Sequence, residues 1–529
     1  MPASMNSSSI CQLSVRSLAG LMSLTTLIML VSGCAAVGPD YETPEAPVSQ
    51  QWIDIDTPGV NNQSAELAQW WTAFNDPVLD SLVDTAYRQN LTLRIAGLRI
   101  LEARANLGIA IGSKYPQTQQ INGGAAKIKI SENEAGSLFA DRRFETAEVT
   151  FDLGWELDFW GRFRRLIESA DAQLDASIAD YDDVMVALAA EVARSYILIR
   201  TFEERLLLAQ DNVVAQQGAL RIADVKFQNG VVTELDVQQA RAVLGNTEAA
   251  VPQLESALRQ SKNALAVLLA LTPQSLGDLL KGSAPIPVAP PEVSMGVPAE
   301  LLRRRPDVRR AERILATQSA QIGVAITDLY PRFSLVGSVG FRTSDSSDTS
   351  FTMDSGLSNL FDSESTTGFL GPFFSWNVFN YGRIKNNIRV QDARFQQLLV
   401  NYQNTVLSAL AETENAIVAY LKAHDQARYL GESVAAAERS VELSMIQYRE
   451  GTTDFNRVLN TLDFLFQQQD ALSATIGDVA TNLIIMYKAL GGGYQTGGER
   501  NVAEYVADED KQQLRTRTRY WRKELPESE

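Results

Sequence analysis

The sequence predicts a mostly helical α+β protein built from two tandem copies of one unit, in which a β-hairpin is followed by a long helical hairpin. Three observations predict this fold class. Blocks of sequence recur at a nearly constant spacing. Several stretches alternate between apolar and polar residues as strands do. The proline-free stretches 164–228 and 385–449 are each far longer than a globular helix. We therefore expect each copy to form one structural unit.

The first 33 residues have the composition of a secretory signal peptide. Residues 17–33 are uncharged and apolar or small, Arg16 precedes them, and residues 30–34 read LVSGC. Small residues before a cysteine resemble a bacterial lipobox, so we expect cleavage before Cys34 and a covalent lipid on Cys34. An ordinary signal peptide with a chance cysteine, or an uncleaved anchor, is the alternative.

The internal repeat covers most of the remaining chain. Residues 106–116 match residues 321–331 at an offset of 215, and from Trp155 and Trp376 onward the offset is 221. A constant offset through rare residues favours tandem duplication over chance similarity between helical sequences. The matched residues where strand gives way to helix are Trp155, Gly161 and Arg162 in the first copy and Trp376, Gly382 and Arg383 in the second.

The expected order of segments follows from the repeat. It comprises a signal peptide with lipobox (1–33), an N-terminal extended segment (34–77), repeat 1 (78–284), a proline-rich linker (285–297), repeat 2 (298–494) and a charged C-terminal tail (495–529). Each repeat is expected to contain a helix (about 78–112 and 298–327), a β-hairpin (about 117–160 and 332–381) and a long helical hairpin (about 164–271 and 385–490).

The strand-like stretches are long enough to cross a membrane. Residues 149–159 alternate between an apolar and a largely acidic face, which places Glu156 and Asp158 on the acidic one. Residues 333–341 repeat the alternation, and residues 121–130 and 369–380 are expected to complete the two hairpins. A bilayer needs about 9–11 residues per strand, more than an average strand has. Four strands cannot close a barrel in lipid, so we expect several chains to pool their strands.

The helical stretches end at predictable points. Gly230 and Gly451 follow the two long stretches, as expected for left-handed helix caps at tight turns. Returning helices are then predicted over 233–271 and 454–490.

Composition excludes several classes of protein. The formal net charge of −17 is unsuited to a nucleic-acid binder, which needs a basic face. His424 is the one histidine of the chain, so neither a histidine-based metal site nor a histidine triad can form. We expect no enzyme activity and no metal. Beyond residue 33 no uncharged apolar stretch reaches 18 residues, which predicts that strands make any membrane crossing.

Six short phrases follow one another along the chain: GPDY at 38–41, WTAFNDP at 71–77, WELDFWGR at 155–162, LRRRPDV at 302–308, AQIGVA at 320–325 and YKALGGG at 487–493. Together and in this order they resemble the TolC-like outer membrane factors. The resemblance is closest to their lipoprotein branch (NodT-type), the channels of tripartite RND-type efflux pumps.

The resemblance implies a homotrimer in the outer membrane of a Gram-negative bacterium. Four strands per chain would form a twelve-stranded transmembrane β-barrel, continued by a long α-helical coiled-coil barrel across the periplasm. The implied function is passive export of small toxic compounds, and the implied partners are outer-membrane lipid, a periplasmic adaptor (membrane fusion protein) and an inner-membrane pump of RND type.

The resemblance also implies functional positions at the helix turns. Family members narrow at the turn after the residues that match Tyr448 and Gly451, often with leucine or aspartate where this chain has Asn456, Arg457 and Asn460. We hypothesise a hydrogen-bonded gate formed by Asn456 and Asn460 and latched by Arg457 to Asp454 or Asp463 of a neighbouring helix; ordinary solvated helix ends are the alternative. The adaptor is expected to contact the turns at Phe227, Gly230, Tyr448, Glu450 and Gly451.

Two other functions fit parts of the sequence. A type I secretion conduit would share the fold, and the lipobox and residues 302–308 favour efflux over it. A structural coiled-coil envelope lipoprotein would use the long helices, but it has no use for alternating strands of membrane-crossing length.

Overall fold

The computed structural model describes residues 36–525, apart from several short gaps. The gaps are residues 46–47, 50, 56, 62, 64–66, 132, 134–142, 281, 291, 300–303, 347–358 and 496–500. The expected signal peptide and Cys34 lie outside the described residues.

The chain divides into two compact units. The first comprises Met1–Pro44, Ala103–Leu174 and Arg313–Leu399, and the second comprises Glu45–Glu102, Asp175–Glu312 and Val400–Glu529. The first unit holds the large sheet, and the second holds both helical turns.

The large sheet is antiparallel and has the strand order β2-β3-β5-β6. Its strands are β2 (Thr118–Lys129), β3 (Arg143–Glu156), β5 (Arg332–Ser346) and β6 (Thr366–Ser375). The pairing of β3 with β5 joins the two repeats, and β2 and β6 form the two edges. The prediction of four antiparallel strands in a mostly helical chain is confirmed.

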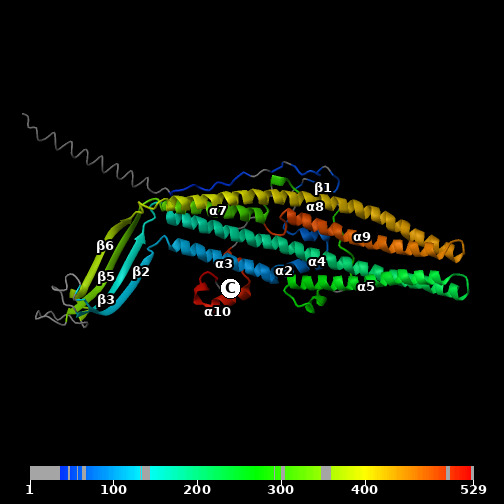
Figure 1. Cartoon of the computed structure of the whole chain (residues 1–529), viewed down its shortest axis with the longest axis horizontal. Helices are drawn as coiled ribbons and strands as arrows, with labels where there is room; N and C mark the ends of the chain where they lie inside the picture. Colours follow the sequence, from blue (N-terminus) through cyan, green and yellow to red (C-terminus); the bar gives the residue numbers. More distant parts are fainter. Residues whose placement is uncertain are drawn as a thin grey trace, which may run out of the picture. The chain divides into compact units, whose positions relative to one another are not determined.

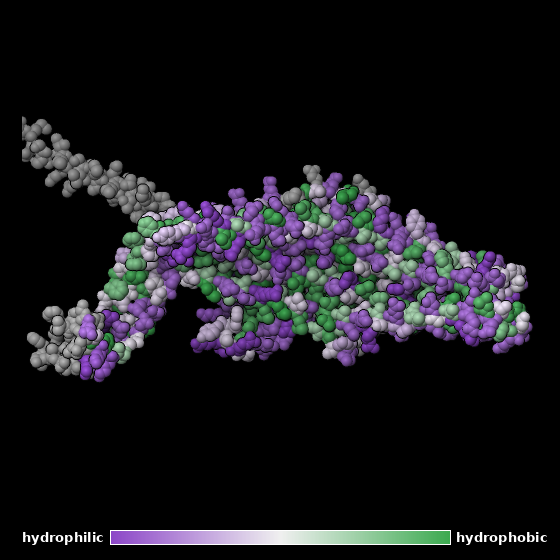
Figure 2. Space-filling model, viewed as in Figure 1, coloured by the Kyte–Doolittle hydropathy of each residue, from purple (hydrophilic) through white to green (hydrophobic). Residues whose placement is uncertain are grey.

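The two faces of the sheet differ as the alternation predicts. Phe151 lies opposite Val339 on one face, and Asp152 lies opposite Ser338 on the other. Arg342 on the polar face makes an ion pair with Glu148 at 2.7 Å. Figure 2 shows hydrophobic residues on the visible surface of the sheet.

The strand ends differ from the prediction. β3 stops at Glu156 rather than at residue 159, because the carboxylate of Asp158 accepts hydrogen bonds from the backbone N–H groups of Phe163 and Arg164 at 2.9 and 3.1 Å. Asp158 therefore caps the next helix instead of lining the sheet. β6 covers 366–375 rather than 369–380, and β5 extends to residue 346.

Each repeat contains one long helix and one returning helix (Figure 1). The long helices are α4 (Arg162–Gln228) and α8 (Arg383–Arg449), each of 67 residues and therefore about 100 Å long. The returning helices are α5 (Glu234–Leu268) and α9 (Phe455–Ala489), each of 35 residues.

The helices that precede the sheet hairpins are interrupted, so the expectation of continuous helices is wrong. The first is split at Asn90 into α2 (Pro77–Gln89) and α3 (Leu91–Gly112), because the Asn90 side chain caps α3 by accepting from the Leu93 N–H at 2.9 Å. The second, α7 (Pro306–Thr327), begins at a proline, which disfavours helix at the preceding Arg305.

The core of the second unit packs the N-terminal segment against the helices. Within η1 (Trp70–Phe74), Trp70 stacks on Tyr487 of α9 with ring centroids 5.3 Å apart. The short strands β1 (Val60–Asn61) and β4 (Val293–Ser294) pair in parallel and attach this segment to the linker.

Part of the expected C-terminal tail is packed. It forms η5 (Val502–Tyr505), α10 (Asp508–Arg517) and η6 (Arg519–Trp521). Val506 and Leu525 are buried against Leu101 of α3, and Arg94 binds Asp510 at 2.8 Å. Among the described helices, none is long and apolar enough to cross a membrane.

Candidate functional site: the hairpin tips and the strand-to-helix joints

The two hairpin tips have the same backbone turn. Gly230 and Gly451 have φ of 72° and 76°, which confirms the predicted left-handed caps. Val231 N–H donates to the Lys226 carbonyl at 2.9 Å, and Thr452 N–H donates to the Gln447 carbonyl at 2.9 Å. These six-to-one hydrogen bonds define Schellman motifs, which end each long helix at a fixed residue.

The returning helices begin with capping side chains. Thr233 and Asp236 form a capping box at the start of α5. Asp454 caps α9 by accepting from the Arg457 backbone N–H at 3.0 Å. Within one chain Asp454 therefore stabilises the helix start.

Tyr448 joins the two tips. The Lys226 ammonium lies 3.7 Å from the centroid of the Tyr448 ring and donates to the Tyr448 carbonyl at 3.0 Å. The ring of Phe455 lies 4.9 Å from the Tyr448 ring, centroid to centroid. Burial, with a smaller contribution from the charge of Asp236, raises the pKa of Tyr448. The contact fixes the end of the first hairpin against the second.

Three of the expected aperture residues lie on the exposed side of α9. Asn456, Arg457 and Asn460 are exposed, whereas Val458 and Leu459 are buried. Asn456 and Asn460 are one helical turn apart and so lie on the same face. Among the described residues, the Arg457 guanidinium makes no ion pair, and Asp463 accepts from the Gln467 amide at 2.7 Å. The latch would therefore have to form with another chain.

The residues expected to contact an adaptor differ in exposure. Phe227 is 42% exposed, and Gly230, Glu450 and Gly451 are exposed as well. Tyr448 is only 3% exposed. Its side chain is therefore not on the surface of the chain, and an adaptor would meet the other residues of the two turns.

The two strand-to-helix joints share one hydrogen bond. Trp155 Nε1 donates to the Lys114 carbonyl at 3.2 Å, and Trp376 Nε1 donates to the Leu329 carbonyl at 3.0 Å. The tryptophans are 221 residues apart and the acceptors 215, which are the two offsets of the repeat. Gly161 and Gly382 have φ of 82° and 81°. The matched sequence therefore produces matched joints.

The charged residues of the joints differ. Arg162 donates to Asp328 at 3.0 Å, and Arg332 binds the same carboxylate at 2.6 Å. Arg383, the match of Arg162, is exposed and makes no ion pair among the described residues. One joint is closed by an internal ion pair and the other is not.

Sequence reasoning did not find the role of Arg165. Its guanidinium, 4% exposed, donates to the carbonyls of Val37 and Gly38 at 3.3 and 3.2 Å and binds Asp40 at 2.7 Å. Val37 N–H donates to the Trp160 carbonyl at 3.0 Å. The N-terminal segment is thus held against the first joint. The signal available was a departure from the repeat, because the second copy has asparagine at the matched position.

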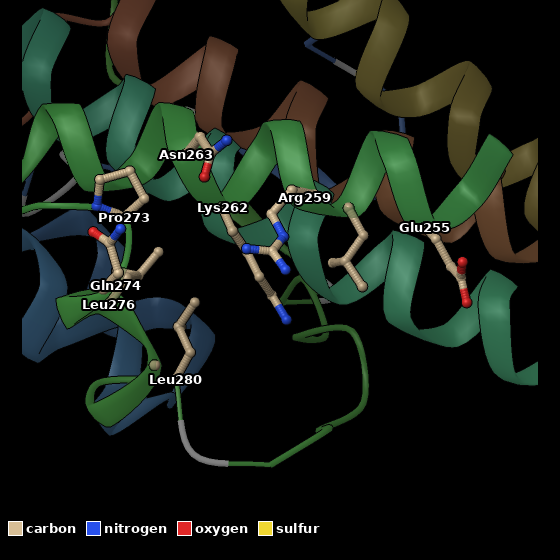
Figure 3. Close-up of a pocket in the computed structure, with 10 residues that line it drawn as sticks. Glu255, Arg259, Lys262, Asn263, Pro273, Gln274, Leu276 and Leu280 are labelled. Carbon is tan, nitrogen blue, oxygen red and sulfur yellow. The ribbon is translucent and has the colours of Figure 1, made fainter. Parts of the chain in front are cut away.

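The part of the chain that the structure describes shows no metal cluster beside these features. Within the described residues, no cluster of three or more His, Cys, Asp or Glu side chains could hold a metal ion. A pocket of about 540 Å³ lies between α5 and η2 (Ser275–Asp278). Figure 3 shows Arg259 and Lys262 extending into it from α5. Lys262 is already bound to Glu203 at 2.9 Å within the chain.

Comparison with known proteins identifies the family. The model of the outer membrane efflux protein family matches the chain twice, over residues 82–271 and 297–492. The chain belongs to this family, and the double match agrees with the tandem repeat. It is an outer-membrane efflux channel and not an enzyme.

Individual relatives agree with the family. Nodulation protein T of Rhizobium leguminosarum bv. trifolii is 30% identical over 472 residues, 88% of this chain and 96% of the relative. The probable outer membrane lipoprotein SilC of Salmonella typhimurium is 28% identical over 486 residues, 90% of this chain and 98% of the relative. The structure of the outer-membrane channel OprN is 32% identical and has a TM-score of 0.80, covering 87% of this chain and all of that one.

Proposed function

We propose that the chain forms the exit duct of a tripartite efflux system. Three copies would pool their strands into a twelve-stranded transmembrane barrel, and their long helices would form a tube across the periplasm. Small toxic compounds would enter from an inner-membrane pump of RND type through a periplasmic adaptor. The duct itself would be passive, with the energy supplied by the pump.

The observation that carries this proposal is the open four-stranded sheet. Its edge strands β2 and β6 have 12 and 10 residues, the length required to cross a bilayer. Each has one edge without a partner in the chain's sheet. Unpaired backbone groups are not tolerated in lipid, so a membrane position requires strands from other copies.

The exposed surface of the hairpin tips supports contact with further proteins. Asn456, Arg457 and Asn460 are available to face neighbouring copies and would form the narrow point of the tube. Arg457 would bind Asp454 or Asp463 of a neighbouring helix. Phe227, Gly230, Glu450 and Gly451 are available to an adaptor. The contact of Lys226 with Tyr448 joins the two turns that carry these residues.

The docking of the N-terminal segment supports a lipid on Cys34. Only Ala35 lies between Cys34 and Ala36, so the chain from Cys34 to Ala36 spans at most about 7 Å. Arg165 and Trp160 hold the residues that follow against the strand-to-helix joint, where a strand would leave the membrane. A lipid at this point would reach the bilayer without further chain. Labelling with radioactive palmitate should mark the protein, and Cys34→Ala should abolish the label.

Crosslinking in intact cells tests the partners. A photoreactive residue at Glu450, beside the second turn, should capture an adaptor protein identified by mass. The same residue at Glu432, about five turns away on α8, is the matched control and should capture less of that adaptor. Capture of a peptidoglycan or surface protein at Glu450, with no adaptor at other tip positions, would contradict the efflux assembly.

A further inference from the structure

The two joints use one aromatic position differently. Trp160 in the first joint and Tyr381 in the second occupy matched positions. Trp160 stacks on Tyr330 of the second repeat, with ring centroids 4.5 Å apart and an interplanar angle of 25°. Its Nε1 also donates to the Pro331 carbonyl at 2.8 Å. The first joint is therefore closed by a ring from the other repeat.

The second joint has no such closure. Tyr381 is fully exposed and has φ of 49°, which is a strained conformation for a bulky residue. The residue that matches Tyr330 is Tyr115, and it is 62% exposed. Among the described residues, neither the Tyr381 ring nor the Tyr115 ring contacts another aromatic ring.

The sheet explains why these tyrosines do not meet within one chain. β3 of the first repeat pairs with β5 of the second, and the strands that match them are β6 and β2. β6 and β2 are the two opposite edges of the sheet. Pairing of β6 with β2, the match of the β3–β5 pairing, can therefore form only between two copies of the chain. Repeated head to tail, this pairing closes a ring of copies.

We propose that Tyr381 of one copy stacks on Tyr115 of the next copy, where β6 pairs with β2. The contact between copies would then repeat the Trp160–Tyr330 contact within the chain. A stacked partner would also hold Tyr381 in its left-handed conformation. The inference rests on the proposed oligomeric channel and names residues that join its copies.

Cysteine crosslinking tests this contact cleanly. The sequence has only Cys11 and Cys34, of which the first would be removed with the signal peptide and the second blocked by lipid. The double variant Tyr115→Cys with Tyr381→Cys should give dimers and trimers with a short bis-maleimide in isolated outer membranes. Each single variant should give none. Trp160→Cys with Tyr330→Cys is the matched control. It should form a crosslink within one chain and give no ladder, meaning no crosslinked dimers and trimers on a denaturing gel.

Native mass measurement of the detergent-purified double variant separates two failures. An oligomer that gives no ladder, while the control closes its internal link, overturns the tyrosine contact and leaves the channel proposal standing. A monomer in both the variant and the unmodified protein overturns both. A ladder in the double variant alone supports the contact.

A second variant tests the stacking itself. An aromatic pair is worth about 2- to 12-fold in the dissociation constant of each contact. Tyr381→Ala should weaken the oligomer by about that factor, measured by dilution and native mass. Tyr381→Trp, which places the residue of the first joint in the second, should retain the oligomer. Equal behaviour of the alanine and tryptophan variants would contradict a stacking role.

Discussion

Two matched junctions, one in each repeat, hold the end of the returning helix by the same contact made with different side chains. In the first repeat, Asn90 Nδ2 donates to the Leu268 carbonyl at 2.8 Å. In the second, Arg305 Nη1 donates to the Ala489 carbonyl at 2.8 Å. The donors are 215 residues apart and the acceptors 221. The contact has thus survived duplication although its donor has changed.

The difference lies in what else each donor binds. Asn90 also caps α3 and remains a neutral group. Arg305 is buried and binds Asp307 at 2.8 Å and Glu412 at 2.7 Å. Burial alone would raise the pKa of Asp307, but the hydrogen bonds and charge of Arg305 outweigh it and lower that pKa. Both repeats therefore keep a hydrogen bond to the carbonyl at the end of the returning helix. The donor is a neutral amide in the first repeat and an ion-paired guanidinium in the second, according to the charged residues nearby.

The largest effect is expected when Arg305 is exchanged for the residue of the first repeat. Arg305→Asn leaves the partly buried carboxylate of Asp307 without its cation, whereas Glu412 keeps Lys488 at 4.0 Å. We expect the free energy of unfolding to fall by about 3 kcal/mol, since breaking a buried pair leaves an uncompensated charge. Denaturant unfolding of the purified channel measures it.

The matched control for that exchange is Asn90→Ala. It removes a neutral cap and one hydrogen bond, so a loss of about 1–2 kcal/mol is expected. If Arg305→Asn is no more destabilising than Asn90→Ala, the ion pairs contribute nothing and the contrast between the junctions is lost.

The tips offer an exchange of intermediate size. Lys226 matches Gln447 of the second repeat, and Lys226→Gln removes the ammonium from the Tyr448 ring. A cation–π contact contributes about 0.5–2 kcal/mol, so the proposed narrow point should loosen and the resting conductance in planar bilayers should rise by up to about 30-fold. Lys226→Arg keeps the cation and is the control. An unchanged conductance in Lys226→Gln would show that Lys226 takes no part in the proposed gate.

A smaller effect is expected at the ends of the returning helices. Ala270 and Gly491 occupy matched positions with φ of 53° and 74°, and only glycine adopts that region without strain. Ala270→Gly should raise the free energy of unfolding by about 1 kcal/mol. Gly491→Ala should lower it, since the added Cβ would also lie 3.3 Å from the Cα of Arg305. Opposite signs in thermal unfolding would confirm the pair, and equal signs would contradict it.

The smallest effect concerns pH. His424 matches Glu203 of the first repeat and packs edge-on against the Tyr420 ring at 4.7 Å. Burial lowers the pKa of His424, and the opposing effect of Asp425 is smaller. The unfolded chain therefore binds a proton more readily, and the stability present above pH 6.5 is lost as the pH falls below it.

Because the His424 imidazole is partly exposed, the change should stay below about 1 kcal/mol. Comparing unfolding at pH 7.5 and pH 5 in the parent and in His424→Gln measures it. A pH dependence that is the same in both proteins would show that His424 does not contribute.

The sequence predicts the features that depend on local signals. Proline-free length and a glycine at each turn define the long helices and the caps at Gly230 and Gly451. Alternation identifies the strands, but it cannot show that Asp158 leaves the sheet, because an acidic residue fits the alternating pattern and a helix cap equally well.

Features that depend on distant contacts were not predictable. Tyr448 is buried among residues of the first hairpin, and its contact Lys226 lies 222 residues earlier in the chain. The docking of residues 36–40 depends on Arg165, which breaks the repeat rather than follows it. The contact of the Asn90 amide with the Leu268 carbonyl, unlike the local cap that splits the helix, joins residues 178 positions apart. In each case one side chain gains its role only when the fold brings a second segment to it.

The two unpaired edges of the sheet also have a consequence for biogenesis. A chain that has folded but not yet met its neighbours presents the backbone donors and acceptors of β2 and β6, and such edges template aggregation. Oligomerisation covers these edges. A high local concentration of newly made chains therefore shortens the time during which the edges are exposed and lowers the risk of aggregation. Stability measured on this protein should accordingly rise with its concentration.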